Sequence, residues 1–178
     1  MKIIDTQLND CFVIEPDIFE DERGFFLETY NSNKYMQINN FPNTFVQDNH
    51  SKSYKNTLRG LHLQLKKPQG KLVRVVSGEV FDVAVDLRPN SSSFGFWHAE
   101  YLNEVNKKQL WIPPGFAHGF LVMSDEADFE YKCSELYYPE DEVCIIWNDP
   151  KLNIDWPTDD PTLSNKDANG LSLGEIKL

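Results

Sequence analysis

The sequence has few cysteines, and their spacing matches neither a disulfide framework nor a metal-binding motif. Cys11, Cys133 and Cys144 form no CxxC pair and leave an odd thiol. We therefore expect reduced and mostly buried thiols, as in a cytoplasmic protein. An N-terminal apolar stretch followed by a cleavage site is also lacking, so secretion is not expected.

Positive charge is scarce as well. The chain carries 17 Lys and Arg residues against 28 Asp and Glu residues, for a formal net charge of −11 at pH 7. This balance disfavours nucleic acid and membrane surfaces as partners, because both favour a basic face. No apolar run approaches the ~20 residues that span a bilayer. An anionic small molecule would need a local cluster of cations.

Helical patterns are few, whereas strand patterns are many. At 178 residues the chain is most simply a single domain, residues 1–178, with a sizeable core. Residues 80–87 alternate, with Asp82 and Asp86 on one face and apolar side chains on the other. Residues 72–76 precede this strand and a Ser-Gly-Glu turn separates the two, which predicts a hairpin.

Short strands and short helices account for most of the remaining chain. Further strands are expected at residues 24–30, 45–49, 94–102, 109–112, 116–122, 129–133 and 143–147. Short helices are expected at residues 33–39 and from Asp167 onward. This pattern, with Gly, Pro, Asn and Asp turns between the strands, predicts an all-β antiparallel sandwich or small barrel.

Two segments, residues 59–64 and 111–120, combine a histidine with glycine and apolar residues. Imidazole is suited to proton transfer near neutral pH, and glycine lets another group approach the backbone closely. On a strand, His62 would share a face with Gln64, and buried polar groups need partners, which favours a functional pocket. For His118, which follows a Pro-Pro-Gly turn, structural and functional roles are equally supported.

Other side chains suit an anionic ligand and proton transfer. Arg23, Arg59 and Lys71 would form a local positive patch if they cluster, although each alone fits a solvated surface cation. Tyr131 and Tyr137 lie at strand spacing, which is typical of structural tyrosines, but a phenol can also donate a proton to a carbanion.

A metal site is not expected. The pattern Pro-x-Gly-x-x-His ending at His118 resembles the second motif of the cupin superfamily. Metal-binding cupins also carry His-x-His followed closely by Glu, whereas His62 is followed by Leu-Gln-Leu-Lys-Lys. Two ligands remain where transition metals usually take three or more, and the lysines would repel a cation.

Seven ordered segments match one family: residues 19–26, 45–51, 58–62, 69–74, 80–88, 111–120 and 146–150. Through them the chain resembles the dTDP-4-dehydrorhamnose 3,5-epimerases, the RmlC-like branch of the cupin superfamily, along nearly its whole length. The resemblance implies a cupin-type jelly-roll barrel and a homodimer whose partners exchange N-terminal residues, Arg23 among them. It also implies a dTDP-sugar substrate and no cofactor.

The implied reaction inverts C3 and C5 of dTDP-4-dehydro-6-deoxy-D-glucose, giving dTDP-4-dehydro-β-L-rhamnose for dTDP-L-rhamnose biosynthesis. The C4 ketone acidifies the protons on both carbons, so the site needs a base, an acid on the opposite face and a cation at the enolate oxygen. By resemblance His62 is the base, Asp167 holds its tautomer, Tyr131 is the acid and Lys71 lies near the C4 oxygen.

The resemblance further implies a set of positions that bind the nucleotide sugar. They are Arg23, Glu28, Gln47, Asp48, Asn49, Arg59, His118, Tyr137, Glu142 and Lys166. Among them, Tyr137 would stack on thymine. Three alternatives stay open: a C3-only epimerase for another dTDP-deoxysugar, a metal-dependent cupin oxygenase or isomerase, and a non-catalytic sugar-binding barrel.

Overall fold

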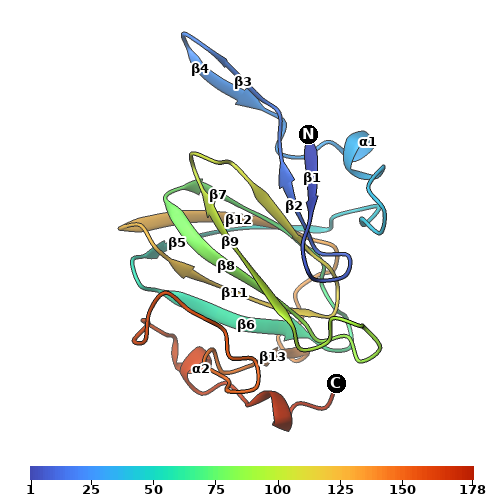
Figure 1. The fold of residues 1–178 in the computed structure, drawn as a ribbon, viewed down its shortest axis with the longest axis vertical. Helices are drawn as coiled ribbons and strands as arrows, with labels where there is room; N and C mark the ends of the chain where they lie inside the picture. The colour runs from blue at the N-terminus through green and yellow to red at the C-terminus, as the bar shows by residue number, and fades with distance from the viewer.

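The structure, a computed structural model, describes residues 1–178 as two antiparallel sheets with a separate hairpin (Figure 1). The six-stranded sheet has the order β1-β2-β10-β7-β12-β5. Its strands are β1 (Lys2–Asp5), β2 (Phe12–Glu15), β5 (Gln47–Tyr54), β7 (Lys71–Ser77), β10 (Gln109–Ile112) and β12 (Glu126–Cys133).

The five-stranded sheet has the order β13-β6-β11-β8-β9. Its strands are β6 (Leu58–Gln64), β8 (Glu79–Asp86), β9 (Trp97–Asn103), β11 (Phe116–Val122) and β13 (Glu142–Cys144). The hairpin of β3 (Ile18–Asp21) and β4 (Gly24–Leu27) extends away from both sheets (Figure 1).

Helical structure is limited to α1 (Ser32–Tyr35), α2 (Asn165–Ala168) and one 3-10 turn, Leu173–Glu175. None of these helices has the length and apolar character needed to cross a bilayer. The predicted class, all-β with antiparallel strands and a few short helices, is confirmed.

Three buried clusters hold the layers together. The central cluster joins the inner faces of both sheets, for example Val73 and Phe129 with Ala84 and Phe120. A second cluster lies between the outer face of the five-stranded sheet and the C-terminal segment, which runs below β6 in Figure 1. A third packs the α1 region against the outer face of the six-stranded sheet. Burial on both sides of each sheet explains why several strands are apolar throughout.

The predicted hairpin between residues 72–76 and 80–87 is wrong. Strand β7 pairs with β10 and β12, whereas β8 pairs with β9 and β11 in the other sheet. Gly78, with φ +80°, turns the chain from one sheet into the other. Its backbone N–H donates to Glu104, so this turn is anchored to the β9–β10 connection instead of closing a hairpin.

The other expected elements differ from the observed ones mainly at their ends. Residues 109–112 and 116–122 coincide with β10 and β11. The strand predicted at residues 45–49 runs instead over β5, and the one predicted at residues 24–30 is shorter in β4. Strands β1, β2 and β3 were not predicted.

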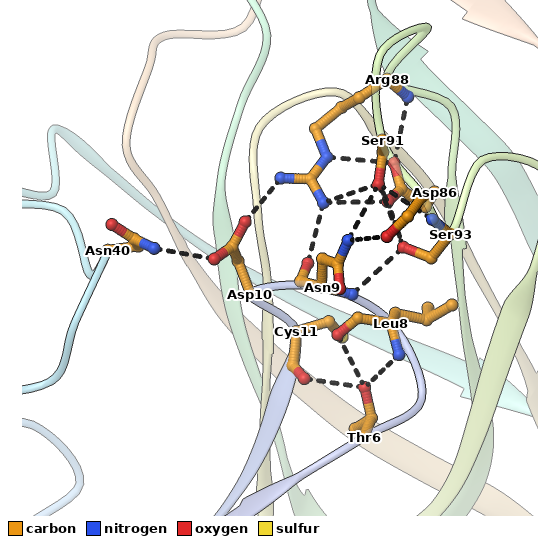
Figure 2. Close-up of polar contacts among 11 residues, drawn as sticks. Thr6, Leu8, Asn9, Asp10, Cys11, Asn40, Asp86, Arg88, Ser91 and Ser93 are labelled. Atoms are coloured by element: carbon orange, nitrogen blue, oxygen red, sulfur yellow. Dashed lines mark hydrogen bonds and ion pairs between the residues drawn. The ribbon is translucent and has the colours of Figure 1, made fainter.

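Asp82 and Asp86 share a face of β8, as the alternation predicts, but both are completely buried. Figure 2 shows the network that satisfies Asp86. Arg88 donates from Nη2 to Asp86 at 2.9 Å and from Nη1 to Asp10 at 2.8 Å, while Ser91 and Ser93 each donate to Asp86 at 2.6 Å. The network ties the β1–β2 turn to the β8–β9 connection.

Two glycines let β6 and β11 approach closely beside the histidines. A Cβ on Gly60, whose φ is +115°, would lie 2.6 Å from the Cα of Gly119 and from the carbonyl oxygen of His118. A Cβ on Gly119 would lie 2.7 Å from the carbonyl oxygen of Arg59. The predicted function of glycine here, close approach of another backbone, is therefore confirmed.

Candidate active site

A cavity of about 400 Å³ opens between the two sheets and is closed on one side by the C-terminal segment. All four predicted catalytic residues line it, together with seven of the ten predicted sugar-binding positions. From the five-stranded sheet come His62 on β6 and His118 on β11, and from the six-stranded sheet come Lys71 on β7 and Tyr131 on β12. The topology thus brings together residues far apart in the sequence, such as His62 and Asp167, which are 105 positions apart.

The tightest polar contact in the cavity joins His62 to Asp167. The Nε2 of His62 lies 2.5 Å from Oδ1 of Asp167, which is almost completely buried. A carboxylate accepts but does not donate, so Nε2 carries the proton and Nδ1 is left with a lone pair. The imidazole itself is partly exposed and can therefore meet a ligand in the cavity.

Asp167 is fixed by the start of helix α2. Ser164, the N-cap residue, donates from Oγ to Oδ2 of Asp167 at 2.7 Å and accepts from the Asp167 backbone N–H at 3.1 Å. Burial raises the pKa of Asp167, but hydrogen bonds from His62 and Ser164 outweigh it, and the net pKa is lowered. The site therefore contains a carboxylate that stays ionised beside the imidazole.

Tyr131 and Lys71 present groups with opposite shifts of pKa. Burial, aided by Cys133 and Glu142, raises the pKa of Tyr131 to about 12, so its phenol keeps its proton at neutral pH. Burial also lowers the pKa of Lys71, and no carboxylate forms an ion pair with its ammonium group. A phenol that can donate and a lysine amino group without an ion-pair partner therefore face the same cavity.

His118 is buried and forms a second histidine–aspartate pair. Its Nε2 lies 2.9 Å from Oδ2 of Asp82 on the adjacent strand β8. Burial lowers the pKa of His118 despite the opposing charge of Asp82, so the imidazole is neutral at pH 7. In the sheet, His118 is directly paired with His62.

Charged and amide side chains surround the entrance to the cavity. Lys166 donates to Glu142 at 2.6 Å, and the Tyr137 hydroxyl donates to the same carboxylate at 3.2 Å. Gln47 accepts from the Tyr137 backbone N–H at 2.9 Å, and Arg59 donates to Ser53 at 2.9 Å. Asn49 completes the set and accepts from Gln47. Of the predicted positive patch, Arg59 and Lys71 line the cavity together with Lys166, beside the carboxylates of Glu142 and Asp167, whereas Arg23 does not.

Three predicted residues lie elsewhere in the chain. Asp48 lines a neighbouring cavity of about 360 Å³, which shares Asn49 and Tyr131 with the first. Glu28 binds Lys34 and Asn31 near α1. Arg23 lies at the β3–β4 turn, binds Asp21, and its side chain is 84% exposed. Within one protomer, Arg23 and Glu28 do not reach the cavity.

Sequence reasoning missed several residues that build the cavity. Ser164 caps the helix that presents Asp167, and the spacing Ser-x-x-Asp was a visible capping signal. Asp82 stood out only as one of two acidic residues in a strand. Phe120, Phe129 and Cys133 also line the cavity but gave no signal beyond apolar strand residues.

One group of donors has the composition of a metal site. His62, Cys144 and Asp167 place one potential ligand atom each within 4.8 Å of one another. Two of these residues already bind each other, and Cys144 donates weakly to Asp167 at 3.6 Å. The ammonium of Lys71 lines the same cavity. This arrangement fits a proton-transfer pair, whereas a cation would have to displace that proton and meet the positive charge of Lys71.

The model of the family dTDP-4-dehydrorhamnose 3,5-epimerase matches residues 5–175. The chain belongs to this family. The dTDP-4-dehydrorhamnose 3,5-epimerase of Pseudomonas aeruginosa is 52% identical over 98% of this chain and 97% of its own length.

Solved structures agree. The epimerase RmlC of Legionella pneumophila in complex with dTDP-4-keto-L-rhamnose is 50% identical, with a TM-score of 0.94 over 99% of this chain and 94% of that one. ChmJ, a 3'-monoepimerase of Streptomyces bikiniensis in complex with dTDP-quinovose, is 30% identical, with a TM-score of 0.89 over 96% and 87%.

These findings confirm the predicted RmlC-like cupin jelly roll. They also confirm the predicted enzyme, a dTDP-4-dehydrorhamnose 3,5-epimerase of dTDP-rhamnose biosynthesis.

Proposed function

We propose that the cavity between the sheets performs this epimerisation with His62 as the base, Tyr131 as the acid and Lys71 at the C4 oxygen. The observation that carries the proposal is the 2.5 Å contact between His62 and Asp167 in the cavity that Tyr131 and Lys71 also line. Base, acid and cation are the three groups that epimerisation beside a ketone requires.

In the first step, Nδ1 of His62 removes the proton from the carbon beside the ketone. The electron pair of the C–H bond forms a double bond between this carbon and C4, and negative charge develops on the C4 oxygen. Asp167 stabilises the imidazolium that forms, and the buried ammonium of Lys71 stabilises the enolate. Low local polarity strengthens both interactions relative to water.

In the second step, Tyr131 donates its phenolic proton to the opposite face of the same carbon. The carbon is then inverted and the ketone restored, while solvent exchange returns the proton to the phenolate and removes the one on the imidazolium. A pKa near 12 keeps Tyr131 protonated until the enolate forms. Repetition at the second carbon uses the same groups.

The remaining cavity residues bind the nucleotide sugar in this proposal. Arg59 and Lys166 suit the diphosphate, because both are cations at the entrance of an otherwise acidic protein. Tyr137 is about half exposed and offers a flat ring for thymine. His118, from the buried wall of the cavity, and Glu142, beside Lys166, then contact the sugar.

We further propose a homodimer in which the β3–β4 hairpin completes the partner's site. The side chains of Phe19, Phe25 and Phe26 are 61%, 56% and 66% exposed, which is a large apolar surface for one hairpin. Arg23 lies at its tip, away from the cavity of its own chain. A second copy would cover the phenylalanines and receive the guanidinium beside the diphosphate.

Two further proposals concern the whole chain. We propose that residues 1–178 fold as one domain, because the central cluster takes side chains from Leu8 to Phe129 and from both sheets. A single cooperative unfolding transition would support this. We also propose a cytoplasmic location, since all three cysteines are free, and cell fractionation tests it.

Proton NMR of dTDP-4-dehydro-6-deoxy-D-glucose in deuterium oxide, with protein dialysed against chelator, tests the reaction. We expect deuterium at both C3 and C5 and none with His62→Ala. Deuterium at C3 alone would indicate the C3-only epimerase instead. Exchange that disappears after chelation and returns with metal would indicate the metal-dependent cupin, and no exchange at all would indicate a binding protein.

Mixing two inactive variants tests the exchanged hairpin. Arg23→Ala and His62→Ala protomers, unfolded and refolded together, would form mixed dimers in which one site is intact if Arg23 acts across the interface. Activity of about a quarter of wild type is then expected, because half of the dimers are mixed and each has one good site. No recovery would place Arg23 in its own protomer's site, whereas an Arg23→Ala protein that is active by itself would place Arg23 outside any site.

A further inference from the structure

The connection between β12 and β13 carries Tyr137 and contains no helix or strand. Backbone N–H and C=O groups in such a segment need hydrogen-bond partners just as those in a sheet do. Here glutamine side chains supply several of them. Gln69 donates to the carbonyl of Glu135 at 2.9 Å, and Gln47 accepts from the N–H of Tyr137 at 2.9 Å. A third glutamine, Gln64, makes two further contacts with the same segment.

Gln64, the last residue of β6, holds the backbone on both sides of Tyr137. Its Nε2 donates to the carbonyl of Leu136 at 3.1 Å, and its Oε1 accepts from the N–H of Tyr138 at 2.8 Å. Nε2 also donates to the carbonyl of Lys67 at 2.7 Å. Both ends of the amide are therefore used, and the residue is only 4% exposed. This buried side chain ties the Tyr137 segment to the five-stranded sheet.

The ring of Tyr137 is held far less than its backbone. It lies at the cavity entrance, the residue is 46% exposed, and its hydroxyl donates to Glu142 at 3.2 Å. Ordering a mobile side chain or loop when a ligand binds lowers affinity. A backbone fixed on both sides of the ring restricts its position before any ligand arrives, so less ordering is left for the binding step.

We propose that Gln64 is a positioning residue for nucleotide recognition, which fixes the segment around Tyr137 so that the ring is in place to stack on thymine before the substrate binds. The inference rests on the proposed function of Tyr137. Gln64 does not line the cavity, so it acts through the backbone of its neighbours and not on the nucleotide.

The variant Gln64→Met removes the three hydrogen bonds and nearly keeps the shape of the side chain. Calorimetric titration of the full chain with dTDP measures the effect. Loss of a stacked ring weakens nucleotide binding about 5- to 150-fold, which is the range expected for the Kd of dTDP in Tyr137→Ala. In Gln64→Met the ring is present but not fixed, so Kd should rise about threefold to tenfold and not more than in Tyr137→Ala. KM should follow Kd, while kcat changes less than about twofold.

The double variant distinguishes positioning of the ring from a general loss of structure. If Gln64 acts through the ring, Gln64→Met has no further effect once Tyr137→Ala is present, and the Kd of the double variant should lie within about twofold of Tyr137→Ala. Multiplied effects in the double variant, or an unchanged Kd in Gln64→Met, overturn the inference. An unchanged Kd in Tyr137→Ala would instead overturn the proposed function of Tyr137.

Asn106→Leu is the matched control. Its amide also makes three hydrogen bonds to backbone: Nδ2 donates to the carbonyl of Tyr101 at 2.8 Å, and Oδ1 accepts from the N–H groups of Asn103 at 3.2 Å and Lys108 at 3.0 Å. Asn106 lies in the β9–β10 connection and does not line the cavity. We expect this variant to unfold more easily and to keep the wild-type Kd for dTDP. An equal rise of Kd in both variants overturns the inference.

A measurement on wild type keeps the inference testable if Gln64→Met does not fold. Relaxation of ¹⁵N nuclei in the protein without nucleotide reports the picosecond-to-nanosecond motion of each backbone amide. Order parameters of about 0.85, the value of rigid backbone, are expected for Leu136, Tyr137 and Tyr138. Values below about 0.6 would show that the segment is mobile before dTDP binds, which would overturn the inference.

Discussion

Replacing Asp167 by Asn tests the pair on which the proposed mechanism depends. The amide has nearly the shape of the carboxylate, and its oxygen can still accept from Ser164. Its nitrogen, however, would donate toward Nε2 of His62, which places the imidazole proton on Nδ1 and removes the lone pair from the cavity. The imidazolium formed during catalysis would also lose its counter-charge.

The structure indicates the size of the loss. The 2.5 Å contact is a charge-assisted hydrogen bond, and such bonds contribute about 2–3 kcal/mol when one partner is ionised. At about 1.4 kcal/mol for each factor of ten, kcat should fall roughly 30- to 150-fold. KM should change little, because Asp167 contacts the base and not the substrate.

Exchange rates at C3 and C5, measured by proton NMR in deuterium oxide, provide the assay. Asp149→Asn is the control: Asp149 is also buried, but it accepts backbone N–H groups of Lys151, Leu152 and Leu173 away from the cavity. It should lose stability and keep its kcat. A kcat of Asp167→Asn within about threefold of wild type would refute the assignment.

The same variant has a pH signature in stability. The folded-state pKa of Asp167 lies below its ordinary value of 3.8, so ionisation stabilises the fold above that value. This contribution is lost as pH falls through the lower, folded-state pKa. The difference in unfolding free energy between wild type and Asp167→Asn should therefore shrink on acidification below about pH 4.

Three further predictions concern the acid, a buried network and the glycine contact. Tyr131→Phe should slow inversion more than proton abstraction, so NMR should find deuterium incorporated with retention; an equal slowing of both would contradict the acid assignment. Arg88→Ala should cost about 3–5 kcal/mol in urea unfolding, because it leaves the Asp86 carboxylate buried without its cation. Burial raises the pKa of Asp86, yet hydrogen bonds from Arg88 and the serines bring it to about 2. The unfolding free energy that wild type loses between pH 4 and 2 should therefore be smaller in Arg88→Ala. Gly60→Ala should lower the unfolding free energy by more than about 2 kcal/mol in the same assay, because residue 60 has a φ of +115° and its new Cβ would meet the backbone of Gly119. A change below about 0.5 kcal/mol would refute the close-packing argument.

Local patterns predicted strands well and their pairing poorly. Such patterns depend on a few neighbouring residues: alternation located β8 within a residue, and short apolar runs between turn residues located β10 and β11. Which sheet a strand joins depends on distant partners. The Ser-Gly-Glu turn between β7 and β8 looked like a hairpin turn, yet the chain there changes sheets.

The same limit applied to the acidic residues. Asp82 and Asp86 were placed on the correct face of β8, but alternation does not distinguish a solvated face from a buried one. The distinction comes from partners: Arg88 lies two residues away, whereas His118 is 36 residues away and on another strand. Sequence patterns reveal the first kind of partner and hide the second.

Asp167 is the clearest case of a site residue that composition could not find. Its surroundings read as a surface turn, and its partner is 105 residues earlier. Only family resemblance selected it, although the capping pattern from Ser164 could have indicated a short helix that presents its side chain. In the structure that helix is what aims the carboxylate at the imidazole.

Backbone packing links the two histidine–aspartate pairs. His62 and His118 are direct partners across β6 and β11, and the glycines beside them, Gly60 and Gly119, bring the strands into close contact. Each histidine is then held from outside its own strand, one by the α2 start and one by β8. Because the separation of the imidazoles is set by two glycines and their orientation by two buried carboxylates, one pair can be perturbed without the other. A backbone change such as Gly60→Ala should move both pairs together, whereas Asp167→Asn should disturb the His62 pair alone.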